Sequence, residues 1–192
     1  MAINENTIPN ILDFLRRAEG LKSTLRTSWT RNGRQESTAE HSWRLALFAM
    51  LITDQYPDLD ALRILKLCLV HDLGETINGD IPAPKQNGSK TEDERADMVD
   101  LLRPLPQSMQ DEFMSLWEEY EFMQTPEAQV VKALDKLETL LQHTQGINPP
   151  DIDYAFNLDY GTRYTDCDPF IRELRAIIDT ETRCCQKGSL GK

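Results

Sequence analysis

Residues 59–75 read LDALRILKLCLVHDLGE, and this stretch decides how the chain folds. Apolar side chains occupy nearly every side of the helix that it predicts, which is typical of a helix at the centre of a bundle. The other apolar segments also follow helical rather than alternating spacing. The sequence therefore predicts an all-α protein in which residues 1–192 form one helical bundle, with a core of about residues 8–185 and a frayed tail over 186–192.

Further helices are expected on both sides of this central one. Ser37 and Glu40 form the S-x-x-E pattern of a capping box, which predicts a helix over residues 38–54. A polar, arginine-rich connection is expected before it, over residues 25–36. The other predicted elements are helices over 8–20, 92–102, 107–120, 126–143 and 169–185, a loop over 78–84, and short turns over 143–169.

The composition limits the partners of the chain. There are 21 Lys and Arg against 32 Asp and Glu, a net charge of −11, which disfavours binding to polymeric nucleic acid. A small anionic substrate remains possible, because a cation and a few arginines can reverse the potential inside one cleft. Four cysteines without a CxxC pair, no signal peptide and no apolar run long enough to span a membrane predict a cytoplasmic protein with reduced thiols.

The adjacent His71 and Asp72 are the most informative polar residues, because they lie in the most apolar predicted helix. Burying an unpaired carboxylate costs several kcal/mol or more, and protonation, an arginine or a metal ion can offset this cost. No cation lies within one helical turn of Asp72. A metal ion satisfies a neutral imidazole and an ionised carboxylate together, so this pair indicates a metal site.

Two other residues can complete such a site. His41 shares a helical stripe with Leu45 and Phe48, so its side chain is expected to point inward. On its own, such a histidine is typical of a hydrogen-bonded core residue. Asp135 lies at the edge of an apolar stripe on the predicted helix 126–143, where a solvated charge is an equally good interpretation.

Taken together, His41, His71-Asp72 and Asp135 on three predicted helices resemble the metal site of the HD-domain phosphohydrolase superfamily. A closer similarity to the HDDC-type and YfbR-like 5'-deoxynucleotidases extends over most of the chain. The blocks that carry it are RTSW (26–29), EH (40–41), HDLGETINGDIPAP (71–84), WEEYE (117–121) and VKALDK (131–136).

This resemblance implies an enzyme that removes phosphate from deoxyribonucleoside 5'-monophosphates. It also implies an all-helical HD domain that forms a homodimer and holds one divalent cation with His41, His71, Asp72 and Asp135. Two imidazoles and two carboxylates are compatible with Mn, Co, Fe, Ni, Zn or Mg.

The resemblance also implies roles around the metal. Arg26 matches the phosphate-binding arginine of the family, and a guanidinium can grip two phosphate oxygens at once. Glu75 and Asp80 match the acidic residues that follow the HD pair. Both are expected to contact the substrate, and Glu75 together with Asp80 is expected to orient the attacking water or to donate a proton to the leaving group. From the residues alone, Glu75 can instead be a charge at a helix end, and Asp80 can cap a turn. Trp29 can contact the base or sugar, or be a core or lid aromatic.

His143 lies eight residues beyond Asp135, about 12 Å along a helix, so we expect this residue at the surface and expect the metal site to hold one ion.

Two other functions are compatible with the sequence. One alternative is an HD hydrolase of another phosphorylated metabolite such as ppGpp, although these enzymes carry a Glu-Asp pair where this chain has Gly74-Glu75-Thr76. The other is a non-catalytic helical protein that keeps the metal for stability.

Overall fold

Helices account for nearly all of the regular structure, as the sequence predicts. The computed structural model describes residues 7–81 and 90–190, and within these ranges the only strands are two short ones. In chain order the elements are α1 (Thr7–Ala18), η1 (Glu19–Lys22), β1 (Leu25–Trp29), β2 (Gln35–Ser37), α2 (Thr38–Ile52), η2 (Thr53–Gln55), α3 (Ala61–Val70), α4 (Glu75–Asn78), α5 (Lys90–Leu102), α6 (Gln107–Glu121), α7 (Pro126–Gln145), α8 (Tyr154–Asp159), α9 (Thr162–Thr165) and α10 (Pro169–Leu190). The predicted all-α fold class is confirmed.

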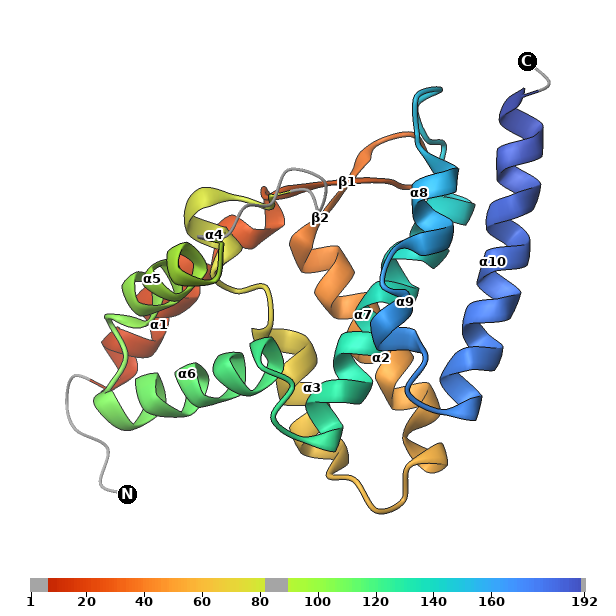
Figure 1. The fold of residues 1–192 in the computed structure, drawn as a ribbon. Coiled ribbons are helices and arrows are strands. Elements are labelled where there is room, and N and C mark those ends of the chain that lie inside the picture. The colour runs from red at the N-terminus through yellow and green to blue at the C-terminus, as the bar shows by residue number, and fades with distance from the viewer. Residues whose placement is uncertain (1–6, 82–89, 191–192) are drawn as a thin grey trace.

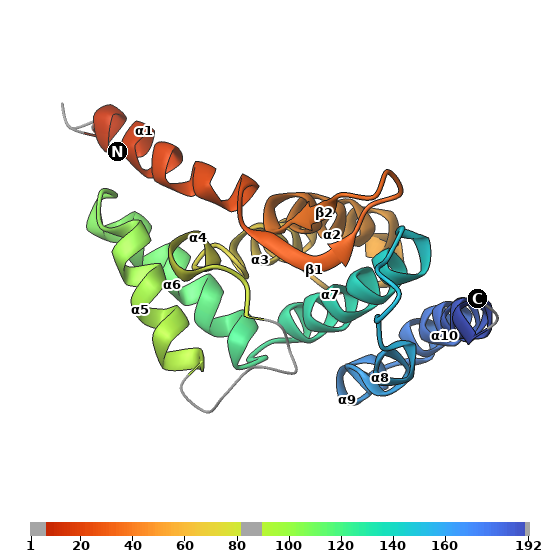
Figure 2. The same cartoon turned by 90° about the horizontal axis from the view of Figure 1, so that it is seen from above.

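The long helix α7 lies at the centre of the fold and packs against α2, α3, α6, α10 and β1. Figures 1 and 2 show α1 and α5 on one side of it and α8, α9 and α10 on the other. Val131, Leu134 and Leu137 of α7 are fully buried, together with Leu45 of α2 and Leu67 of α3. Each such side chain stabilises the fold by roughly 1.5–3 kcal/mol. The packing therefore holds α7 rigidly, and with it the polar residues that α7 carries.

The polar connection predicted over 25–36 is a β-hairpin over residues 25–37, and its two strands were not predicted. β1 and β2 pair antiparallel, with Leu25 opposite Ser37. Figure 1 shows β1 running from the end of α1 toward α8. The buried side chains of β1 are polar, so this strand lacks the alternating hydrophobic pattern by which strands are recognised.

The central helix is shorter than predicted. α3 ends before His71, and a turn over residues 71–74 with i to i+3 hydrogen bonds precedes α4, so the prediction of one helix over 59–75 was wrong at its end. Adjacent side chains on a regular helix point about 100° apart. The turn removes this constraint, and His71 and Asp72 face the same space. Because nearly every side of this helix is apolar, all of its leucines were expected to be buried. Leu62 and Leu69 are instead exposed.

The other predicted helices are confirmed, with differences of a few residues at their ends. The capping box is present: the Ser37 hydroxyl accepts from the Glu40 backbone N–H, and the Glu40 side chain accepts from the Ser37 backbone N–H. The segment 143–169, expected to form turns, contains the short helices α8 and α9. Of the predicted loop 78–84, residues 82–84 lie outside the described residues.

The last helix continues further than the sequence predicts. α10 reaches Leu190, past the expected end at Cys185 and into the segment 186–192 that was expected to be frayed. No proline follows Pro169, so the backbone hydrogen bonds of this helix can continue.

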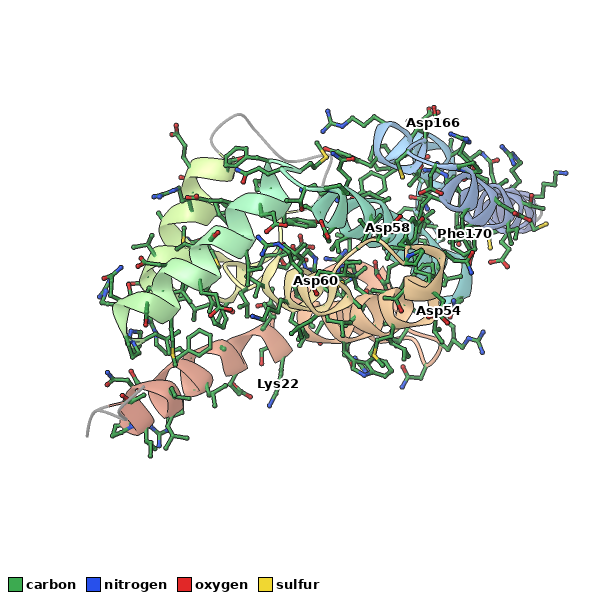
Figure 3. All side chains as sticks on the ribbon, turned by 90° about the horizontal axis from the view of Figure 1, so that it is seen from below. Lys22, Asp54, Asp58, Asp60, Asp166 and Phe170 are labelled. Carbon is green, nitrogen blue, oxygen red and sulfur yellow. The ribbon has the colours of Figure 1, made fainter. Side chains whose placement is uncertain are left out.

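Four aspartates can be located on the side of the molecule seen from below (Figure 3). Figure 3, seen from below, shows Asp54, Asp58 and Asp60 around the connection between α2 and α3, and Asp166 beside α9. Within the described residues, none of the helices combines the length and apolar character needed to span a bilayer.

Candidate metal and phosphate site

Four residues that the sequence singled out come together where α2, α3 and α7 meet. His41 Nε2 lies 3.2 Å from Asp135 Oδ1 and 3.9 Å from Asp72 Oδ2. His71 Nε2 lies 3.0 Å from the same oxygen of Asp72. Ligand atoms of His41, His71 and Asp72 all lie within 4.8 Å of one another. Three elements far apart in sequence therefore supply two imidazoles and two carboxylates to one small space.

The hydrogen bonds of the two histidines determine which ring nitrogen carries a proton. His71 Nδ1 lies 2.9 Å from the carbonyl oxygen of Cys68, which can only accept, so this nitrogen donates. His41 Nδ1 donates to the carboxylate of Glu138. In the neutral form of either ring Nε2 is an acceptor, and both Nε2 atoms are buried without a hydrogen-bond partner among the described residues. Two such lone pairs beside two carboxylates fit a divalent cation, which would satisfy all of them.

Glu138 is a residue of the site that sequence reasoning missed. Its carboxylate is fully buried and accepts from His41 Nδ1 through Oε2 and from Arg44 Nε, at 2.5 Å, through Oε1. It therefore holds the His41 ring in one orientation while Arg44 offsets its charge. The available signal was spacing, because Glu138 lies one helical turn after Asp135 and Arg44 lies three residues after His41.

The second oxygen of Asp135 is held away from the histidines by two donors. Tyr120 OH donates to Asp135 Oδ2 at 2.6 Å, and Lys136 Nζ donates to the same atom at 2.7 Å. Burial and the nearby carboxylate of Asp135 raise the pKa of Tyr120 well above its usual value, so the phenol keeps its proton. These two bonds leave Oδ1 of Asp135 facing His41.

Arg26 extends from β1 to the same place. Its Nη1 lies 3.4 Å from Asp72 Oδ2, its Nη2 donates to Thr139 Oγ1 at 3.0 Å, and its Nε lies 3.7 Å from the buried carboxylate of Glu36. Burial opposes the charged form, but the carboxylates of Asp72 and Asp80 outweigh it and keep the pKa of Arg26 above its usual value. The structure thus puts a permanently charged guanidinium next to the proposed metal ligands.

Glu75 and Asp80 both line the cavity in front of these residues. Glu75 is buried in the first turn of α4, and Thr38 Oγ1 donates to its Oε2 at 3.0 Å. Burial, followed by the nearby carboxylates of Asp72 and Asp80, raises the pKa of Glu75 to about 9. This shift favours the protonated form of the carboxyl, which can donate a proton.

A cavity of about 650 Å³ extends from these residues toward α8. This volume lies in the range typical of small-molecule sites. The lining also includes Trp29 from β1, and around α8 it combines apolar side chains such as Phe156 with polar ones such as Asn157. The expectation that His143 is a surface residue was wrong: it is half-buried, lines the cavity and bonds to Ser28 and Asn157. It was missed because its side-chain partners come from β1 and from α8, which are distant in the sequence or lie beyond the end of α7.

The model of the HD domain family matches residues 18–175, which is most of the chain. The chain belongs to the HD domain family. It is similar to the 5'-deoxynucleotidase HDDC2 of Danio rerio, with 42% identity over 138 residues that cover 69% of this chain and 68% of the relative. The 5'-deoxynucleotidase hdd1 of Schizosaccharomyces pombe is 41% identical over 142 residues, which cover 69% of this chain and 70% of that protein. Among solved structures, a predicted metal-dependent phosphohydrolase from Magnetospirillum magnetotacticum covers 96% of both chains with a TM-score of 0.83 and 26% identity.

Proposed function

We propose that this chain removes the 5'-phosphate from deoxyribonucleoside 5'-monophosphates and that His41, His71, Asp72 and Asp135 hold one divalent cation for this reaction. The observation that carries the proposal is the pair of buried Nε2 atoms that face carboxylates without a hydrogen-bond partner in the described part of the chain. The relatives named as 5'-deoxynucleotidases support the choice of substrate. Sequence and geometry leave Mn, Co, Fe, Ni, Zn and Mg as candidate ions.

The residues around the ligands suit hydrolysis of a phosphate ester. When bound, a divalent cation would lower the pKa of a coordinated water and stabilise the negative charge on phosphoryl oxygens. Arg26 can grip two oxygens of the phosphate, and its charge stabilises the transition state. The protonated carboxyl of Glu75 can donate its proton to the 5'-oxygen as the nucleoside leaves. Asp80, also on the cavity wall, helps to keep Glu75 protonated through its own negative charge.

The direct test is phosphate release by the purified full chain. The substrates are deoxyribonucleoside monophosphates, ribonucleoside monophosphates and ppGpp, each with Mn, Co or Mg supplied in turn. We expect turnover of the deoxyribonucleoside monophosphates that disappears when the metal is removed with a chelator. Turnover of ppGpp alone would favour the alternative of an HD hydrolase acting on that metabolite and would contradict the proposal.

Two variants distinguish an enzyme from a protein that keeps its metal only for stability. Arg26→Ala should lower kcat/KM by roughly 10²- to 10³-fold, because one charge-stabilising donor is lost. Glu75→Ala should lower kcat through loss of the proton donor. Arg34→Ala is the matched control, because Arg34 is exposed in the same hairpin and pairs with Glu40. Folded, metal-loaded Arg26 and Glu75 variants that match the parent in turnover would refute the catalytic assignments.

The broader assignments follow from this function. We propose a single HD domain with a core of about residues 8–185, acting in the cytoplasm as a homodimer on a small nucleotide. The match of the HD domain over residues 18–175 supports the single domain. Light scattering of the purified chain would test the dimer, and a monomer at working concentration would contradict it.

A further inference from the structure

One face of α7 carries three cavity-lining residues at steps of four positions. Asp135 faces the histidines, Thr139 accepts a hydrogen bond from Arg26, and His143 follows one turn later. Each step of four residues advances about 6 Å along a helix axis. A substrate whose phosphate lies at Arg26 can therefore place its pentose close to His143.

On the opposite wall of the cavity, β1 carries Arg26 and then Ser28, in the same direction as Thr139 and His143 on α7. Arg26 and Ser28 are two residues apart, so their side chains lie on the same face of the strand, about 7 Å from each other along its axis. Both line the cavity, and β1, whose C-terminal end is nearer to Ser28 than to Arg26, runs toward α8 (Figure 1). Ser28 Oγ lies 3.1 Å from His143 Nε2. β1 and α7 therefore come into contact at Ser28 and His143, about one helical turn beyond Arg26 and Thr139, where we place the phosphate.

Both ring nitrogens of His143 are used by the protein itself. Nδ1 lies 3.2 Å from Oδ1 of Asn157, an oxygen that can only accept, so Nδ1 carries the hydrogen. Nε2 is then the acceptor for the hydroxyl of Ser28. Burial, as the largest effect, lowers the pKa of His143, and the ring is neutral at physiological pH. The ring thus lines the cavity with both of its polar atoms already bonded.

We propose that His143, held by Ser28 and Asn157, is the residue that makes the site favour 2'-deoxyribose over ribose; this inference rests on the proposed function. A 2'-hydroxyl placed against the ring loses its bonds to water and finds neither ring nitrogen able to accept, because Ser28 and Asn157 already occupy both. The CH₂ group of a deoxyribose packs against the same ring without this cost. A wall of this kind discriminates against an added hydroxyl by roughly 10- to 100-fold in kcat/KM.

Two variants test this role in the full chain with metal supplied. Ser28→Ala removes the hydroxyl that occupies Nε2, so this nitrogen can accept a hydrogen bond from a ribose 2'-hydroxyl. The ratio of kcat/KM for a deoxyribonucleotide to that for the ribonucleotide with the same base should fall about tenfold, through better use of the ribonucleotide. His143→Phe keeps a flat ring without nitrogens, so the ratio should stay close to that of the parent.

The outcomes separate this inference from the proposed function. A parent that hydrolyses both nucleotides equally well, or a Ser28→Ala variant with an unchanged ratio and normal metal affinity, would overturn the role of His143 alone. A parent that releases no phosphate from either nucleotide would overturn the proposed function and this inference with it. If His143→Phe does not fold, the ratio measured for Ser28→Ala still decides.

Discussion

Replacing Glu138 by glutamine should weaken metal binding about 10- to 100-fold, which corresponds to about 1.4–2.8 kcal/mol. The substitution keeps the size of the side chain but changes what its two terminal atoms can accept. In the parent, one carboxylate oxygen accepts from His41 Nδ1 and the other from Arg44 Nε. Glutamine has one acceptor oxygen, so its NH₂ group must face one of these two donors. Either the His41 ring loses its fixed orientation or the Arg44 charge loses its partner.

The assay is titration of metal-free protein with Mn or Co in competition with a chelating dye. It reads metal affinity directly and does not depend on turnover. Glu112→Gln is the matched control, because it makes the same chemical change in an exposed ion pair with Lys66, where the N–O distance is 2.6 Å. That control should bind metal as the parent does. A folded Glu138→Gln protein whose metal dissociation constant lies within about twofold of the parent would refute the reasoning.

Three further predictions concern the surroundings of the site. Gly146→Ala should lower kcat/KM roughly tenfold or more, measured by phosphate release, because the added Cβ would overlap a backbone carbonyl of β1 and displace that strand. Tyr120→Phe removes a donor to the ionised Asp135 and should lower the free energy of unfolding in urea by about 1.5–3 kcal/mol. The hydrogen bond from Arg34 lowers the pKa of Glu40 from 4.5 to about 2, so its contribution to stability is complete above the unfolded value and is lost as the pH falls toward 2. The difference in urea stability between the parent and Glu40→Gln should therefore shrink over that interval, and a constant difference would contradict the assignment.

Features that depend on neighbouring residues in the chain were predicted well. The capping box of Ser37 and Glu40 begins α2 where expected, because its hydrogen bonds join residues three apart. The pairing of His71 with Asp72 was informative because burying a carboxylate carries a large cost whatever the final fold. Asp135 could be chosen among the acidic residues of α7 only through its position in the family pattern.

Features that depend on contacts between distant segments were not predicted. β1 was missed because its inward residues Arg26 and Ser28 are polar, and they are buried only by contact with α7 and the turn after α3. The end of α3 was missed because helix propensity continues past residue 70 while the turn brings two adjacent side chains to one place. Glu138 reads as an ordinary charge on a helix until His41 packs against it.

The sequence by itself determined that this protein is a helical bundle with an H…HD…D metal pattern, because helical periodicity and the cost of buried charge are local properties. Only the tertiary structure decided which residues orient those metal ligands and which residues line the rest of the cavity. Glu138 fixes the His41 tautomer, and Ser28 and Asn157 use both nitrogens of His143. These contacts join residues 14 to 115 positions apart, and hydrogen bonds over such separations follow from packing rather than from any pattern along the chain.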